Sequence, residues 1–266
     1  MKEEQFLRIS RLIGQDNINE LHKKHVTILG IGAVGSSCLE FLVRSGVGSF
    51  TLIDFDKINY SNINRQLIAT HSTVGRLKVE VAKERALDIN PYISVEALPL
   101  FINEDNALDL LKDADVVLDC IDSLNPKINT LAVAIKNNIK IISSMGAALR
   151  RDVNHIRCAD ISQTWACPLA RQVRAGLRKR GIDKGLRVVF SPEEVNFKYT
   201  KIEDEVDREP GFEQGRERVI LGSTVTITSI FGSFMANEAL KALIGDKEFE
   251  GKIAWNAQDK AKGAKN

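Results

Sequence analysis

Three glycines at fixed spacing predict a phosphate-binding loop. Gly30, Gly32 and Gly35 form the pattern G-x-G-x-x-G between an apolar stretch of strand length and a stretch of helical length. Glycines permit a tight turn and close backbone approach, and the N–H groups at the start of the helix attract phosphate oxygens. Asp54 lies near the expected offset of about 20 residues, where a carboxylate binds ribose hydroxyls. The motif alone favours NAD, and a glycine-rich turn without a ligand is the structural alternative.

The polar residues that follow favour phosphate chemistry over hydride transfer. The chain continues with Asp54-Phe55-Asp56, then the block 62–66, Lys78 and the block 119–122. Adenylation of a carboxylate needs cations on the α-phosphate and the leaving pyrophosphate, and a metal ion held by a carboxylate. Arg65 and Lys78 can supply the cations, and Asp122 can hold Mg²⁺. Taken singly, these residues fit a solvated surface charge or a helix cap equally well, so the prediction depends on the set.

The ordered set resembles the adenylating domain of the ubiquitin-activating-enzyme superfamily, which includes the ThiF- and MoeB-like adenylyltransferases. The resemblance extends from residue 8 to about residue 180. It implies that ATP and Mg²⁺ bind, that Asp54 contacts the ribose, and that Asp122 holds the metal. It assigns the phosphate contacts to Asn62, Arg65 and Lys78. Arg11 matches an arginine that such proteins donate across a homodimer interface, although a simple surface charge is the alternative.

Further segments narrow the resemblance to one family. Residues 44–48, 89–91, 121–123, 160–164, 168–170 and 177–179 are similar to the tRNA threonylcarbamoyladenosine dehydratases. The paired C-x-x-C zinc motifs of sulfur-carrier adenylyltransferases are missing from the sequence, and a separate cysteine domain has no room. The resemblance implies that ATP activates the carboxylate of the threonylcarbamoyl group on an anticodon-loop adenosine, after which ring closure releases AMP. The alternatives are an adenylyltransferase for a ubiquitin-like carrier protein, a non-catalytic nucleotide-binding scaffold and an NAD dehydrogenase.

A basic helix supports an RNA partner. Its first turns carry Arg171, Arg174 and Arg178 at spacings that place them on one face, followed by Lys179. Such a stripe suits the phosphate backbone of tRNA, whereas a solvated face paired with acidic residues at 203–209 is the alternative. Cys167 precedes this helix and is either a reactive thiol or inert packing. A sulfur-transfer or redox partner stays open.

These residues must be positioned by alternating strands and helices. Strands are predicted at 26–29, 50–53, 95–98, 116–118 and 139–142, with an antiparallel strand at 155–158. This alternation of strands and helices is typical of α/β proteins. It predicts a Rossmann-like doubly wound, mostly parallel sheet with helices on both faces and a C-terminal α+β extension. The expected organisation is a helical segment at 1–25, the ATP-binding adenylating domain at 26–190, a flexible loop at 191–222, and a helix, strand and tail at 223–266 that complete the same domain.

The composition is that of an ordinary soluble globular protein. Of 266 residues, 44% are apolar and 27% charged, which excludes a disordered chain. The net charge of +2 does not by itself indicate a nucleic-acid partner. The charged N-terminus leads into no apolar signal segment, and polar residues interrupt the apolar stretch at 219–244, so we expect a cytoplasmic protein without a membrane span. The four cysteines are scattered and predict no disulfide framework.

Overall fold

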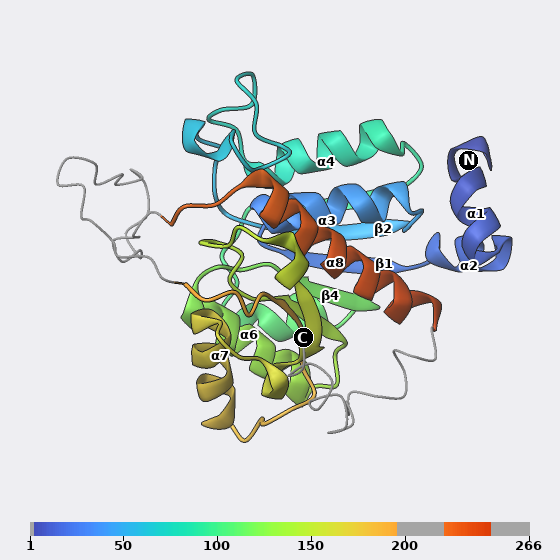
Figure 1. The fold of residues 1–266 in the computed structure, drawn as a ribbon. Coiled ribbons are helices and arrows are strands. Elements are labelled where there is room, and N and C mark those ends of the chain that lie inside the picture. The colour runs from blue at the N-terminus through green and yellow to red at the C-terminus, as the bar shows by residue number, and fades with distance from the viewer. Residues whose placement is uncertain (1–2, 196–220, 246–266) are drawn as a thin grey trace.

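A seven-stranded sheet forms the centre of the molecule. The computed structural model describes residues 3–195 and 221–245. The strand order is β3-β2-β1-β4-β5-β7-β6, and β6 alone runs antiparallel to its neighbour among these strands. The strands span β1 His25–Leu29, β2 Ser49–Ile53, β3 Ser94–Leu98, β4 Val116–Asp119, β5 Ile141–Ser144, β6 Arg157–Asp160 and β7 Arg187–Phe190. The predicted mostly parallel sheet is therefore confirmed (Figure 1).

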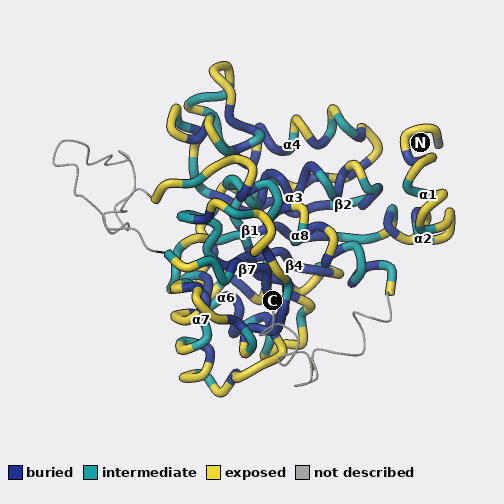
Figure 2. Tube along the Cα trace, viewed as in Figure 1, coloured by how far each residue is buried: buried dark blue, intermediate teal, exposed yellow. Residues whose placement is uncertain are grey.

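Helices cover both faces of this sheet. The α-helices are α1 Leu7–Ile13, α2 Gln15–Leu21, α3 Ala33–Arg44, α4 Lys78–Ile89, α5 Glu104–Leu111, α6 Leu124–Lys136, α7 Pro168–Arg178 and α8 Val225–Ile244. Short 3-10 helices are η1 Glu3–Phe6, η2 Tyr60–Asn62, η3 Val153–His155 and η4 Ile161–Gln163. Because both faces are covered, the central strands are almost wholly buried, as Figure 2 shows.

The apolar core lies in two layers, one on each side of the sheet. One layer packs α3, α4 and α8 against the strands, and the other packs α5, α6 and α7. Helix α8, which comes from the far end of the chain, lies against α3. At this crossing a Cβ on Gly232 would lie 2.5 Å from the Ser37 Cβ, and the Cys38 thiol donates to the Gly232 carbonyl at 3.5 Å. A glycine is therefore required for the two helices to approach this closely.

The two ends of the sheet have different coverings. Helices α1 and α2 adjoin the end where β1 and β2 begin, since the Gly48 N–H donates to the Leu21 carbonyl at 3.0 Å and the His22 ring lies 2.6 Å from the Gly46 carbonyl. The glycine loop, η2 and the connection after β4 lie at the opposite, carboxyl end (Figure 1). In parallel α/β sheets ligands bind at the carboxyl end.

Most predicted elements are present, with small shifts. The strand predicted at 139–142 begins two residues later as β5, and the predicted antiparallel strand is β6. Strand β7, which has four residues and follows a charged turn, was not predicted. Most of the loop predicted at 191–222, and the strand and tail predicted at the end of the segment 223–266, lie outside the described residues. Within the described ranges, no helix is long and apolar enough to cross a membrane.

Candidate active site

The glycine loop is shaped by two close backbone contacts and one open position. Gly30 has φ +81°, and a Cβ there would lie 3.0 Å from the Cys120 carbonyl oxygen. A Cβ on Gly35 would lie 1.9 Å from the Gly30 carbonyl oxygen. Gly32 differs, because the nearest atom to its Cβ would be Gln66 Nε2 at 3.9 Å. The fold therefore requires glycine at two positions, whereas at the third the protein leaves room beside the backbone.

The first turn of α3 presents backbone donors at this open position. Gly32 is the N-cap of α3, and no side chain among the described residues caps the helix there. The first intrahelical bond runs from the Ser36 N–H to the Gly32 carbonyl at 2.9 Å. The N–H groups before Ser36 have no intrahelical acceptor, and the helix dipole is positive at this end. This geometry suits an anion such as a phosphate.

Asp54 attaches the end of β2 to the glycine loop. Its Oδ2 accepts the Ile31 N–H at 2.6 Å, and its Oδ1 accepts the Asp56 N–H at 2.8 Å. Burial raises the pKa of the Asp54 carboxyl, and the Asp56 charge raises it further while the Lys78 ammonium opposes the shift. Each carboxylate oxygen has a second lone pair, so both can still accept a hydroxyl.

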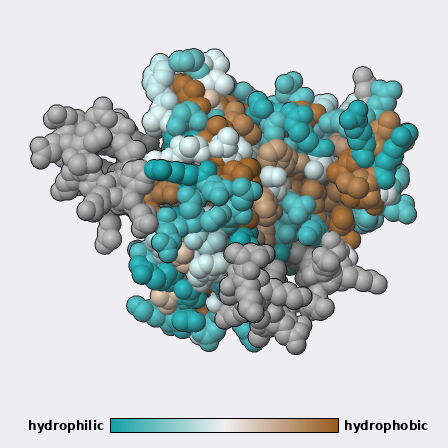
Figure 3. All heavy atoms as spheres, in the orientation of Figure 1, coloured by the Kyte–Doolittle hydropathy of each residue, from teal (hydrophilic) through white to brown (hydrophobic). Residues whose placement is uncertain are grey.

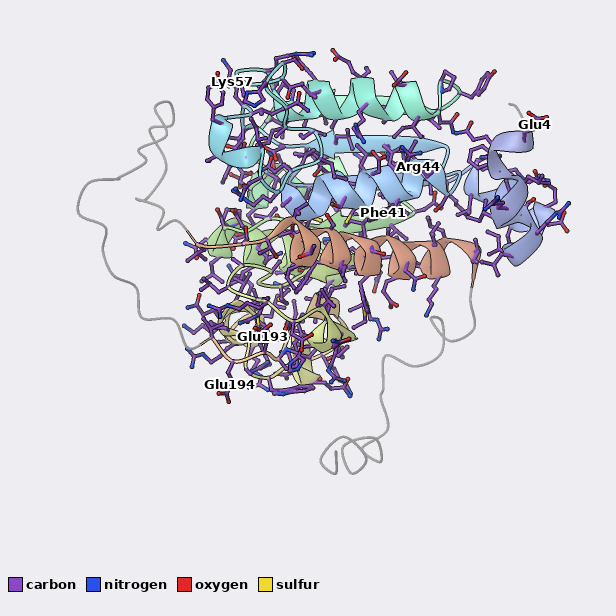
Figure 4. All side chains as sticks on the ribbon, turned by 45° about the horizontal axis from the view of Figure 1, so that its top comes forward. Glu4, Phe41, Arg44, Lys57, Glu193 and Glu194 are labelled. Atoms are coloured by element: carbon purple, nitrogen blue, oxygen red, sulfur yellow. The ribbon has the colours of Figure 1, made fainter. Side chains whose placement is uncertain are left out.

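Lys78 and Asp56 form an ion pair next to Asp54. An isolated bridge between Lys57 and Leu77 holds the segment after β2 against the start of α4, at the end of the molecule where Figure 4 labels Lys57. The next residue, Lys78, is the first of α4 and is buried. Its Nζ donates to Asp56 Oδ2 at 2.7 Å. The structure therefore confines one ammonium group beside the carboxylates at the end of β2.

The segment at 59–66 contributes amide and guanidinium groups. Asn62 is buried, and its Oδ1 accepts the backbone N–H of the η2 N-cap residue at 3.2 Å. Arg65 is partly exposed, and its Nη1 donates to the Ser61 carbonyl at 2.6 Å. Gln66 is buried beside the glycine loop, and its Oε1 has no hydrogen-bond partner in the part of the chain that the structure describes. Sequence reasoning gave Gln66 no role, although it follows Arg65 directly.

A buried charge cluster fixes the connection that carries Asp122. Asp119, the last residue of β4, accepts from Lys127 Nζ at 2.5 Å and from Ser143 Oγ at 2.6 Å. Its other oxygen accepts the Ile121 N–H at 3.1 Å. Asp122 follows at the exposed surface. This cluster could not be predicted, because no local sequence pattern pairs a lysine in one helix with an aspartate in a preceding strand.

The surroundings of Asp122 fit a magnesium ion that is held largely by phosphates. No group of three or more His, Cys, Asp or Glu residues in the described ranges could hold a metal alone. Mg²⁺ commonly binds one or two carboxylates together with substrate phosphates and water. The exposed Asp122 carboxylate could supply one such ligand.

Thus only some of the predicted site residues are joined directly. Hydrogen bonds connect the glycine loop to Asp54, and Asp54 and Lys78 to Asp56. The connection before Asp122 touches the loop through the close approach of Cys120 to Gly30.

Arg11 lies apart from the other predicted residues. It belongs to α1, which adjoins the opposite end of the sheet (Figure 1). Leu7 and Leu12 of the same helix are exposed, at 49% and 84%. Figure 3 shows apolar side chains gathered next to this N-terminal segment. Within one chain, therefore, Arg11 does not reach the glycine loop.

The basic residues of α7 have different environments. Arg171 and Lys179 are exposed. Arg178 forms a 3.5 Å ion pair with Asp183. The Arg174 guanidinium turns back to the protein, where its Nη1 donates to the Thr164 carbonyl at 3.0 Å. The stripe predicted on one face of the helix is thus partly engaged in holding the turn before α7.

Cys167 is a buried residue. It is the N-cap of α7, has 4% of its surface exposed, and belongs to the core layer under α6 and α7. Its Sγ would lie 3.7 Å from a Cβ on Gly146. Burial among apolar groups is typical of inert packing, whereas a reactive thiol needs access.

Comparisons with known proteins identify a family, relatives and solved structures that this chain resembles. The model of the ThiF family matches residues 5–261. The chain is 38% identical over 250 residues to the tRNA threonylcarbamoyladenosine dehydratase of Bacillus subtilis, covering 92% of this chain and 97% of the relative. Two crystal structures of the Escherichia coli tRNA N6-threonylcarbamoyladenosine dehydratase, each 30% identical, are similar in fold. The AMP complex has a TM-score of 0.81 and covers 92% of this chain and 96% of its own. The ATP complex has a TM-score of 0.79, with 93% and 97% covered.

Proposed function

This chain belongs to the ThiF family and, within it, to the tRNA threonylcarbamoyladenosine dehydratases, and on that premise we propose that it uses ATP to activate the carboxylate of threonylcarbamoyladenosine in tRNA. The observation that carries the proposal is the glycine loop, whose one open position faces the uncapped start of α3. The buried Lys78–Asp56 pair and Asp54 adjoin this loop. Loop, cation and carboxylates form a site for a nucleotide whose phosphates react.

Each residue of the site has a part in binding ATP. The backbone N–H groups at the start of α3 bind phosphate oxygens, and Asp54 accepts hydrogen bonds from the ribose hydroxyls. Lys78 neutralises charge at the α-phosphate, where the buried setting strengthens its field. Arg65 and Asn62 bind the phosphates that leave as pyrophosphate. Asp122 would hold Mg²⁺, which supplies further charge neutralisation when bound.

The reaction has two steps. A carboxylate oxygen of the substrate attacks the α-phosphorus, the bond to the bridging oxygen breaks, and pyrophosphate leaves with the electron pair. The adenine N6 nitrogen that bears the threonylcarbamoyl group then attacks the activated carbonyl carbon and loses its proton, which closes a five-membered ring, and the carbon–oxygen bond to AMP breaks. AMP carries away one carboxylate oxygen, so the nucleoside loses the elements of water. Because the nucleophile belongs to the substrate, orientation suffices and no enzyme cysteine takes part.

A homodimer would complete the site. Arg11 lies at the far end of its own sheet, so we propose that it acts in the active site of a second copy. The exposed Leu7 and Leu12 beside it offer an apolar contact surface. An arginine donated in this way would stabilise the charge that develops on the phosphates.

The tRNA would contact α7. Arg171 and Lys179 are exposed and available for backbone phosphates, with Arg178 beside its exposed partner Asp183. Arg174, whose guanidinium is bound to the turn at Thr164, contributes less to tRNA and more to local structure. Charge reversal at Arg171 and Lys179 should weaken tRNA binding and reduce its salt dependence, while Arg174→Ala should chiefly lower the melting temperature.

Mass spectrometry of tRNA nucleosides tests the proposed function. Purified protein is incubated with ATP, Mg²⁺ and tRNA that carries threonylcarbamoyladenosine labelled with ¹⁸O in the carboxylate. We expect the nucleoside to lose water and one labelled oxygen to appear in AMP. Lys78→Ala, Arg65→Ala and Asp122→Ala should fold but form little AMP, whereas the exposed neighbour variant Lys57→Ala should retain activity. Unlabelled AMP, or normal turnover in all three variants, would contradict the mechanism.

A further inference from the structure

Arg150 has a buried guanidinium, two of whose three nitrogens lack a hydrogen-bond partner within the described part of the chain. The residue is 2% exposed, and its Nε and Nη1 are buried without a hydrogen-bond partner among the residues that the structure describes. Arginine remains charged in proteins, and a buried charge is strongly unfavourable unless it is paired and hydrogen-bonded. Since nearly all buried polar groups in native proteins have partners, a guanidinium with two unpartnered nitrogens is a candidate group for binding an anion.

The backbone around Arg150 is held in place on both sides. Leu149 has φ +63°, a conformation that is unfavourable for a leucine, and its N–H donates to the Gly222 carbonyl at 2.8 Å. On the other side the Glu193 carboxylate, labelled in Figure 4, accepts the N–H groups of Arg151 and Asp152 at 2.9 and 3.1 Å. Strained backbone that the surroundings hold in place is found mainly at functional sites.

This segment lies at the carboxyl end of the sheet. It leaves β5, the neighbour of β4, whose end carries the connection to Asp122. Gly146 lies against Cys167 and Leu169 on the α7 side, and Ala147 packs in the core layer of α3 and α8 on the other side. The segment thus crosses the sheet edge and reaches Gly222, three residues before the start of α8. Helix α8 packs on α3, whose first turn is the proposed phosphate site.

We propose that Arg150 binds the carboxylate of the substrate, an assignment that rests on the proposed function. A guanidinium matches a carboxylate in charge and planar geometry. The carboxylate is small enough to reach a nearly inaccessible cation, whereas tRNA backbone phosphates lie on the outside of a large polyanion. Arg150 would thereby distinguish tRNA that carries the threonylcarbamoyl group from unmodified tRNA, because unmodified tRNA leaves the buried cation unpaired.

Paired binding measurements test the assignment. Modified and unmodified tRNA, which share every phosphate, are titrated against wild-type protein, Arg150→Met and the control Arg151→Met. We expect wild type and the control to bind modified tRNA at least tenfold more tightly. Arg150→Met should lose that preference while its affinities for unmodified tRNA and for ATP stay unchanged. Arg150→Lys, which keeps the charge without the planar geometry, should retain part of the preference.

Stability provides an independent readout. Replacing a buried, unpaired charge with methionine should leave the midpoint of thermal unfolding unchanged or higher. A marked fall would mean that Arg150 has a structural partner and would overturn the assignment. An equal loss of affinity for both tRNAs, or a loss for ATP alone, would also overturn it. An inactive wild-type enzyme would refute the proposed function instead, whereas an active wild type with full discrimination in Arg150→Met would refute this inference alone.

Discussion

Two hydrogen bonds connect Lys78 to Asp56, one through the backbone and one through the side chains. The Lys78 backbone N–H donates to the Asp56 carbonyl at 3.0 Å, and the Lys78 ammonium donates to the Asp56 carboxylate at 2.7 Å. The first bond fixes the start of α4 against the end of β2, and the second fixes the direction of the side chain. An ammonium group that is positioned before ATP binds needs little reorganisation during the reaction.

Removal of this cation should suppress activity far more than it weakens ATP binding. For Lys78→Met we expect AMP formation to fall by about 10²–10³-fold, the magnitude typical of losing one preorganised electrostatic contact. Asp56→Asn should give a smaller loss, since the ammonium group is retained and the backbone bond still fixes the start of α4. Rates at saturating ATP and the ATP dissociation constant are the measurements. A Lys78→Met enzyme that loses only ATP affinity would show that the ammonium group has no special role in the transition state.

Two glycines of the phosphate loop should respond in opposite ways to alanine. Gly30→Ala should lower the free energy of unfolding by about 1–2 kcal/mol or more, because φ is +81° and the Cys120 carbonyl is 3.0 Å away. Gly32→Ala should leave stability nearly unchanged and raise the KM for ATP. Gly75→Ala is the control for conformation alone, since Gly75 has φ +87° and open space. Denaturant unfolding and ATP titration separate the two effects, and equal ATP affinity in Gly32→Ala would argue against phosphate binding at this position.

Glu40 should make stability depend on acidity. Burial alone raises the pKa of Glu40, but hydrogen bonds from Arg85 and Arg44 outweigh it and hold the pKa below its ordinary value of 4.5. A carboxyl with a lowered folded-state pKa stabilises the protein fully above its unfolded-state pKa, and this contribution is lost as the pH falls through the folded-state pKa. Glu40→Gln should therefore cost about 1 kcal/mol at pH 7, and progressively less below pH 4.5.

Unfolding curves from pH 3 to pH 8 measure this difference. Glu20→Gln is the matched control, because it removes the charge of a glutamate whose ion pair, with Lys23, is exposed instead of buried. A constant difference between Glu40→Gln and wild type across that range would show that the Arg85 and Arg44 contacts do not depend on the charge.

The buried cluster below the Asp122 connection should show strong coupling. Lys127 and Asp119 are both fully buried, so removing one partner leaves an unpaired buried charge. We expect Lys127→Met and Asp119→Asn each to cost about 3–5 kcal/mol, and the double variant to cost much less than their sum. Additive losses in chemical denaturation would mean that the two side chains act independently.

Arg11 should be required in trans. Arg11→Ala and Lys78→Ala homodimers are each expected to be inactive. Mixing them allows heterodimers in which one site has both residues, so up to about half of the sites in a heterodimer recover. Activity that reappears on mixing, with a dimer detected by light scattering, is the expected result. Failure to recover in a confirmed heterodimer would place Arg11 outside the reaction.

The parts of the site that sequence could predict are those set by local spacing. Gly30 and Asp54 belong to a strand–turn–helix pattern that fixes both their backbone and their chemistry, and the structure places them in contact with the same loop. The buried Gln66 and the buried Lys127 could not be recognised in this way. Their environments depend on contacts between separate elements, and a polar residue in a helix or loop has the same local pattern whether it is exposed or buried.

Dependence on contacts between separate elements also explains where the observed fold differs from the predicted one. Strand β7 has four residues, too few for its sequence pattern to identify it as a strand. Its pairing with β5 and β6 is what makes it part of the sheet. On α7, helical spacing places Arg174 in a basic stripe, yet the turn at Thr164 offers its guanidinium closer acceptors. Periodicity identifies which face a residue occupies, while the partner of a long side chain is decided by neighbours from elsewhere in the chain.

The packing of α8 on α3 sets the timing of folding during synthesis. Cys38 and Gly232, which touch at the crossing of these helices, are 194 residues apart in the chain. At a translation rate of about 5–20 residues per second, α8 is synthesised about 10–40 s after α3, and the apolar side of α3 stays uncovered during that time. The nascent chain therefore leaves the ribosome with one layer of its core incomplete, and chaperones that bind exposed apolar surface should engage it during this interval.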